Sequence, residues 1–172
     1  LPLGASMSPA LPIAGNPVTS SFAWVPDETQ VGTSVVNFLA ISRGTSVTCP
    51  VTIVVVPVLE VMIDIKPVSF PNSINLGSNG NVPVAILGSA TFDATTVDPT
   101  TVTLADSSVR VKGNGQSQAS AEDVNGDALL DLVVHVDTKG LVVSTGDVVA
   151  KLTGETFDGQ LIEGTDSIRI VP

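Results

Sequence analysis

The chain has few of the residues that active sites commonly use. Its 172 residues include one cysteine, one histidine, one tryptophan and no tyrosine. A single cysteine excludes an intrachain disulfide, and neither Cys49 nor His135 has a catalytic partner beside it in the sequence. No glycine-rich phosphate loop precedes a helical pattern, and one tryptophan offers little stacking surface for the sugar of a glycosidase. We therefore expect no enzymatic activity.

Basic residues and long apolar runs are also scarce. Seven lysines and arginines stand against seventeen acids, a net charge of −10, which repels nucleic acid and anionic membranes. The apolar run 51–63 contains Pro57 and Glu60 and is shorter than the roughly 20 residues of a spanning helix. We expect neither nucleic-acid binding nor membrane insertion. The chain begins with leucine and shows no signal peptide, which predicts a processed chain or a fragment.

Valine, isoleucine, leucine, serine and threonine dominate instead, with fifteen glycines and twelve prolines scattered among them. This mixture is typical of short strands joined by turns, and no window has helical periodicity. Alternating or β-branched runs predict strands at 18–25, 33–41, 45–56, 59–66, 82–88, 101–105, 108–112, 130–136, 147–153 and 166–171. We therefore predict an all-β protein.

The distribution of charge predicts two domains. Residues 1–57 contain two acids and one base, a net charge of −1, whereas 58–172 contain fifteen acids and six bases, a net charge of −9. Strand-like sequence crosses this boundary with only Pro57 between, and a proline stiffens the joint. Many short strands at this spacing are typical of sandwiches. We expect two Ig-like β-sandwich domains in tandem, 1–57 and 58–172.

The first domain looks incomplete. Residues 1–57 supply about three clear strands, whereas an Ig-like sandwich needs about seven. The alternation of Val47, Cys49 and Val51 places these side chains on one face and predicts a core there. Three strands leave unpaired edges and an uncovered apolar face. Two completions are open: sequence outside this chain, or a strand from a neighbouring copy, which builds a polymer when it repeats head to tail.

An acidic loop in the second domain has the spacing of a metal site. Asp123, Asn125 and Asp127 alternate, and Asp131 follows four residues later. Such a loop can direct all four side chains at one centre, where three carboxylates repel one another unless a cation lies between them. Oxygen ligands without cysteine or histidine suit Ca²⁺. The alternative is an Asx-type turn that holds no ion.

The neighbours of this loop receive weaker assignments. The twelfth position from Asp123 is Val134 rather than the bidentate glutamate of an EF-hand. Glu122 and Asp137 are reserve ligands, and His135 is structural, since calcium avoids imidazole. A second acidic run is interpreted as turn and solvent-facing positions: Glu155, Asp158, Glu163 and Asp166.

Three segments of the first domain carry a family pattern. Residues 22–26 read FAWVP, 30–32 read QVG and 35–40 read VVNFLA. This order resembles the C-terminal half of bacterial Ig/cadherin-like repeats, with their W-x-P, Q-x-G and V-x-F-x-A steps. The opening LPLGA at 1–5 is similar to a step in the middle of such a repeat. The resemblance implies an Ig-like fold and a start within a domain. We interpret Trp24 as core packing, and a platform for a sugar is the alternative. The acidic residue that follows the last strand of cadherin-like members is absent at 41–43.

The second domain resembles a module that recurs in large secreted and cell-surface proteins of bacteria, through IDIKP at 63–67, VPVAILG at 82–88 and LTGETFDG at 152–159. Its loop is similar to the D-x-N-x-D-G-x-x-D calcium hairpins of integrin-like repeats. That likeness implies Ca²⁺ held by the side chains of Asp123, Asn125, Asp127 and Asp131 and by the carbonyl of Leu129. Ala128 stands where those hairpins have glycine.

These observations together predict a structural role outside the cell. The expected function is a calcium-stabilised subunit of a bacterial extracellular filament, pilus-like fibre or surface adhesin, assembled by self-association into a polymer. The alternative is a carbohydrate- or protein-binding module of a larger secreted protein.

Overall fold

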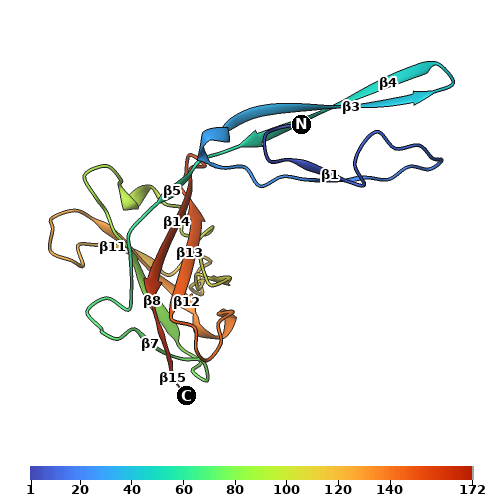
Figure 1. Ribbon diagram of the computed structural model, residues 1–172. Helices are drawn as coiled ribbons and strands as arrows, with labels where there is room; N and C mark the ends of the chain where they lie inside the picture. Colours follow the sequence, from blue (N-terminus) through green and yellow to red (C-terminus); the bar gives the residue numbers. More distant parts are fainter. Residues whose placement is uncertain (172) are drawn as a thin grey trace. The chain divides into compact units, whose positions relative to one another are not determined.

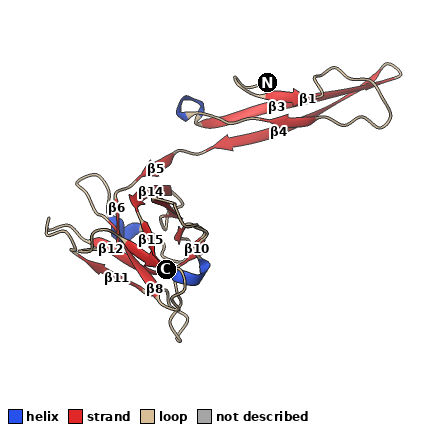
Figure 2. Cartoon of the chain, turned by 60° about the horizontal axis from the view of Figure 1, so that its bottom comes forward, coloured by secondary structure: helices blue, strands red, loops and turns tan. Residues whose placement is uncertain are grey.

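The fold is all-β, as the sequence predicts. The computed structural model describes residues 1–171, and within them the only helical segments are three short 3₁₀ turns (Figure 2). None of these segments is long and apolar enough to cross a membrane. The chain divides after Pro57 into two compact units, Leu1–Pro57 and Val58–Pro172, called unit 1 and unit 2 below.

Unit 1 consists of two separate ribbons. Its elements are β1 (Ser6–Ser8), β2 (Ser21–Ala23), η1 (Glu28–Gln30), β3 (Gly32–Ser42) and β4 (Thr45–Val55). β1 pairs only with β2, and β3 pairs only with β4 over the full length of both strands (Figure 1). Arg43 and Gly44 connect β3 to β4, both with positive φ, as a tight two-residue hairpin turn requires. These four strands form two separate pairs and do not by themselves make the seven-strand sandwich of a complete Ig-like domain.

Unit 1 has almost no core. Val36, 5% exposed, is its one buried apolar side chain. Val47, Cys49 and Val51 do share one face of β4, but all three are exposed, so the prediction of a core there is wrong. Trp24 is half-buried, and its Nε1 donates to the Leu3 carbonyl. Unit 1 therefore presents an apolar face that its own residues leave uncovered.

Unit 2 contains the remaining elements. They are β5 (Val58–Glu60), β6 (Ile63–Ile65), β7 (Ser73–Asn75), β8 (Asn81–Ile86), η2 (Ala94–Thr96), β9 (Thr103–Leu104), β10 (Ser107–Ser108), β11 (Ala119–Glu122), β12 (Asp131–Asp137), η3 (Thr138–Gly140), β13 (Val149–Glu155), β14 (Leu161–Ser167) and β15 (Arg169–Val171). They form a five-stranded sheet, β10-β9-β13-β14-β5, and a four-stranded sheet, β11-β12-β8-β6. β15 and β7 form a separate parallel pair.

The two sheets of unit 2 share one hydrophobic core. β13 alternates exposed and buried residues, so its apolar side chains lie on one face. Leu104 and Leu152 from the five-stranded sheet and Val84, Ile86 and Val134 from the four-stranded sheet are completely buried in the same cluster. This arrangement is consistent with a β-sandwich, and the acidic loop extends from the four-stranded sheet of this sandwich.

Candidate functional site

The acidic loop connects two neighbouring strands of the four-stranded sheet. β11 leads into it, β12 leads out, and Glu122 pairs with Asp131 across the hairpin. All five predicted ligands lie on this hairpin, from Asp123 through the Leu129 backbone to Asp131. Residues 125–130 are exposed, whereas Asp131, the first residue of β12, is buried.

Backbone amides surround the first predicted ligand. Asp123 Oδ1 accepts from the N–H groups of Gly126 at 2.7 Å and Asp127 at 3.2 Å. Its Oδ2 accepts from Ala128 N–H at 3.0 Å. The carboxylate of Asp123 therefore organises the turn on its own, as an Asx-type residue does.

Asn125 and Asp127 continue the same pattern. Asn125 Oδ1 accepts from Asp127 N–H at 3.0 Å, and Asp127 Oδ1 accepts from Leu129 N–H at 2.8 Å. Asn125 Nδ2 donates to Asp127 Oδ2 at 3.1 Å. Across residues 1–171 no three histidine, cysteine, aspartate or glutamate side chains are grouped as a metal would need. The structure thus places the predicted ligands on one loop, whose turn their side chains hold through hydrogen bonds.

Asp131 differs from the other ligands because it is fully buried. It is 0% exposed, Oδ1 accepts from Gly88 N–H at 2.8 Å, and Oδ2 accepts from Val124 N–H at 2.9 Å. Neither ion pair of the described chain involves it. A buried carboxylate without a positive partner is unfavourable. A cation at the loop would supply that partner, and the all-oxygen ligand set suits Ca²⁺.

Gly88 is a partner that sequence reasoning missed. A Cβ on Gly88 would lie 2.5 Å from the Leu130 carbonyl oxygen, so only glycine lets the two backbones approach this closely. The approach places Gly88 N–H against Asp131. Gly88 and Asp131 are 43 residues apart, and no local spacing signals a contact over that separation.

Ala128 keeps the backbone conformation that the absent glycine would favour. Its φ is +68°, in the left-handed region that is unfavourable for a residue with a Cβ. We expect Ala128→Gly to raise the free energy of unfolding of unit 2 by about 1 kcal/mol, measured by urea denaturation followed by circular dichroism. Ala121→Gly, in β11, is the matched control and should destabilise by about 0.5–1 kcal/mol. Equal destabilisation by both changes would contradict the argument from strain.

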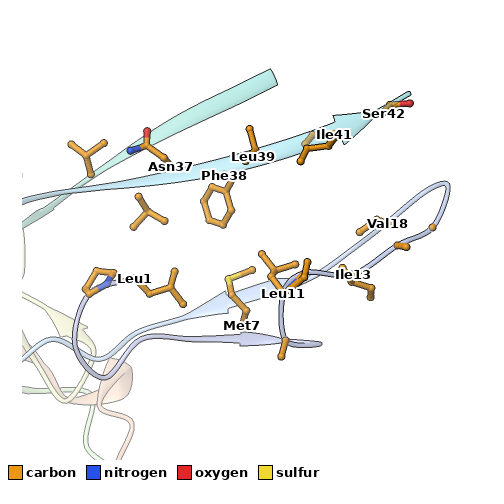
Figure 3. A pocket seen from close by; sticks show the side chains of 18 of the residues that line it. Leu1, Met7, Leu11, Ile13, Val18, Asn37, Phe38, Leu39, Ile41 and Ser42 are labelled. Carbon is orange, nitrogen blue, oxygen red and sulfur yellow. The ribbon is translucent and has the colours of Figure 1, made fainter. Parts of the chain in front are cut away.

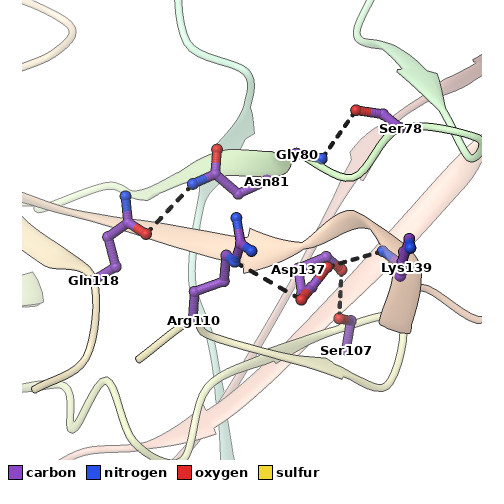
Figure 4. Close-up of polar contacts among 8 residues, drawn as sticks. All are labelled: Ser78, Gly80, Asn81, Ser107, Arg110, Gln118, Asp137 and Lys139. Carbon is purple, nitrogen blue, oxygen red and sulfur yellow. Dashed lines mark hydrogen bonds and ion pairs between the residues drawn. The ribbon is translucent and has the colours of Figure 1, made fainter. Parts of the chain in front are cut away.

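The prediction that Asp137 is a reserve ligand is wrong. It lies at the opposite end of β12 from Asp131, roughly 20 Å away at about 3.3 Å per residue. There Asp137 accepts from Lys139 N–H at 3.1 Å and pairs with Arg110 at 3.8 Å, and its carbonyl accepts from Ser107 Oγ at 2.6 Å (Figure 4). Glu122 does adjoin the loop, but its carboxylate accepts from Ser120 Oγ at 2.6 Å.

The second acidic run is solvent-facing only in part. Glu155 and Asp158 are exposed, and the hydrogen bond from the Thr156 hydroxyl lowers the pKa of Asp158. Glu163 pairs with Lys151 at 2.6 Å. Asp166 is half-buried and accepts from Ile65 N–H at 2.8 Å, so its interpretation as a surface position is wrong.

A groove of about 1500 Å³ lies in unit 1. One wall is β3, and the other is the segment that contains β1 and the loop after it. Met7, Leu11, Ile13 and Val18 face Phe38 across the gap (Figure 3). Leu11, Ile13 and Val18 are exposed in spite of their position. The walls are apolar but do not close on each other.

Comparison with known proteins adds no family to this description. No protein-family model matches the chain. No curated protein is significantly similar to it in sequence. The resemblances to Ig/cadherin-like repeats, to a secreted module and to integrin-like calcium hairpins therefore stay predictions, and the functional argument rests on the residues themselves.

Proposed function

We propose that this protein is a structural subunit of a bacterial extracellular fibre or surface adhesin, in which a β-strand of a neighbouring copy completes unit 1. The supporting observation is the uncovered apolar surface of unit 1. Twenty-two apolar residues of the described chain are buried, and Val36 is the one that belongs to unit 1. The other apolar side chains of unit 1 are at least partly exposed. Burying them in an interface, at roughly 25 cal/mol per Å², would strongly favour association.

The open edges of unit 1 favour a strand as the completing element. β3 and β4 each run for eleven residues and pair only with each other, so each has a second edge without a partner strand among the described residues. Exposed edges of this length accept an added strand through backbone hydrogen bonds. The groove beside β3 offers apolar contacts for alternate side chains of that strand.

Charge favours a second copy of this chain as the source of the strand. Residues 1–57 have a net charge of −1, whereas 58–172 have −9. Two copies therefore meet with least repulsion at unit 1. The same proposal includes tandem Ig-like domains and a Ca²⁺ ion bound by the 123–131 loop. A unit 2 that is stabilised by an ion suits a fibre subunit that has to withstand tension.

The proposal is tested by the association state of the whole chain. Ile41 lines the groove and is 70% exposed, so Ile41→Lys should leave a single copy intact but place a charge in the interface. We expect this change to weaken self-association at least about tenfold, measured by analytical ultracentrifugation. Val142→Lys, at 69% exposure in unit 2, is the matched control and should assemble like the original chain.

Electron microscopy of the native protein supplies the second readout. Regular fibres are the expected result. Isolated monomers, or assembly that is unchanged by Ile41→Lys, would contradict completion by a second copy.

A further inference from the structure

A second group of oxygen-bearing side chains lies where β6 of the four-stranded sheet meets β14 of the five-stranded sheet. Asp64 in β6, Asn72 before β7 and Asp166 in β14 line one cavity of about 390 Å³. The three residues come from segments far apart in the sequence. We propose that these three side chains hold a Ca²⁺ ion, at a site separate from residues 123–131.

Asn72 provides the deciding observation. It is 4% exposed, and its Oδ1 is buried without a hydrogen-bond partner. Its Nδ2 donates to Asp166 Oδ2 at 3.0 Å and to the Ser167 carbonyl at 2.9 Å. Exchanging the amide oxygen and nitrogen would turn the oxygen toward these two acceptors, so its orientation is fixed. A buried carbonyl oxygen left without a donor is unfavourable, and a cation is a partner that it accepts.

Asp64 also lacks a partner. Its half-buried carboxylate takes part in no hydrogen bond or ion pair of the described residues. Burial, and after it the charge of Asp166, raises the pKa of Asp64 above its ordinary value. The nearby ammonium of Lys66 donates to the Ser73 carbonyl at 2.7 Å. The two carboxylates therefore repel each other without a cationic side chain to neutralise them.

The ligand chemistry selects the ion. Two carboxylates and an amide oxygen are hard ligands with neither sulfur nor imidazole among them. Ca²⁺ accepts irregular sets of six to eight oxygens, whereas Mg²⁺ demands near-ideal octahedral geometry. Ser69 and Ser167 line the same cavity, and water can complete the set. Because β6 belongs to the four-stranded sheet and β14 to the five-stranded sheet, the ion would join the two sheets.

Calcium binding by three variants of the whole chain tests this site. Asp127→Ala removes a ligand of the 123–131 loop, Asp64→Asn removes a ligand of the proposed site, and Glu155→Gln makes the same charge change at an exposed position. Ca²⁺ bound per chain is measured by equilibrium dialysis at calcium concentrations up to the millimolar range, with magnesium as competitor. We expect Asp127→Ala to retain one ion, and Asp64→Asn to lose that ion or bind it more than about tenfold more weakly. Glu155→Gln should bind like the original chain.

Thermal unfolding of the same variants separates a metal site from a structural contact. In chelator, Asp64→Asn should melt at or above the temperature of the original chain, because the repulsion with Asp166 is removed. In calcium, Asp64→Asn should instead melt at a lower temperature than the original chain. Full calcium binding by Asp64→Asn, an absence of binding by Asp127→Ala, or the same melting order in both buffers would each overturn the proposal.

Discussion

Asp131→Ala is expected to lower the free energy of unfolding of unit 2 by roughly 3 kcal/mol. The change leaves the N–H groups of Gly88 and Val124 without their acceptors, at a position where Asp131 is 0% exposed. A buried donor without a partner loses its full hydration without compensation. The acidic loop would then lose its attachment to the segment that follows β8.

Circular dichroism or calorimetry is the measurement for this variant, since the single tryptophan, Trp24, lies in unit 1 and does not report on unit 2. Asp131→Asn keeps one acceptor oxygen and should be destabilised less than Asp131→Ala. Asp127→Ala, in the exposed part of the same loop, should cost less than about 1 kcal/mol in chelator. Equal stability of Asp131→Ala and Asp127→Ala would contradict the assigned role of the buried carboxylate.

Gly164→Ala is expected to destabilise unit 2 by a similar amount, roughly 3 kcal/mol. A Cβ at Gly164, in β14, would lie 2.6 Å from the Val61 carbonyl oxygen and 2.9 Å from Ile63 Cγ2. The carbonyl is backbone, and Val61 N–H donates to the Glu163 carbonyl at 2.8 Å, so neither strand can move aside freely. The chain after β5 crosses β14 at a distance that only glycine permits.

Scanning calorimetry of the whole chain measures this effect, and we expect the unit 2 transition to fall by about 10 °C. Gly113→Ala is the matched control, since a Cβ there would meet no atom within 4 Å, and it should change stability by less than about 0.5 kcal/mol. If Gly164→Ala unfolds at the same temperature as Gly113→Ala, the strands separate at little cost and the prediction is wrong.

Strands with strong alternation could be predicted from the sequence, and others could not. The predicted strands 33–41 and 45–56 correspond to β3 and β4, and 130–136 to β12. β14 was missed because Glu163 and Thr165 on its outward side are polar and one inward position is a glycine, which leaves little apolar signal. β11 was missed because its four residues, ASAE, include no large apolar side chain.

Alternation also fails to tell whether a face is covered. The pattern at Val47, Cys49 and Val51 correctly places these side chains on one face of β4, but all three remain exposed. Burial depends on a second layer, and a strand's own sequence does not encode that layer.

For the candidate sites too, local spacing could be read from the sequence, whereas contacts between distant residues could not. The residues of the 123–131 loop follow from local spacing, and the structure places all of them on one hairpin. The contact of Asp131 with Gly88 and that of Asp166 with Asn72 join residues 43 and 94 positions apart. Such pairs are set by the topology of the sheets, which no single stretch of sequence specifies.

The parallel pairing of β5 with β14 has a mechanical consequence. Val58, Leu59 and Glu60 pair in register with Leu161, Ile162 and Glu163, and β5 is the first strand of unit 2. Tension applied from the residues before β5 and from those after β14 pulls these two strands in opposite directions along their length. The backbone hydrogen bonds between them are then loaded together in shear instead of opening one after another, the geometry that best resists a pulling force.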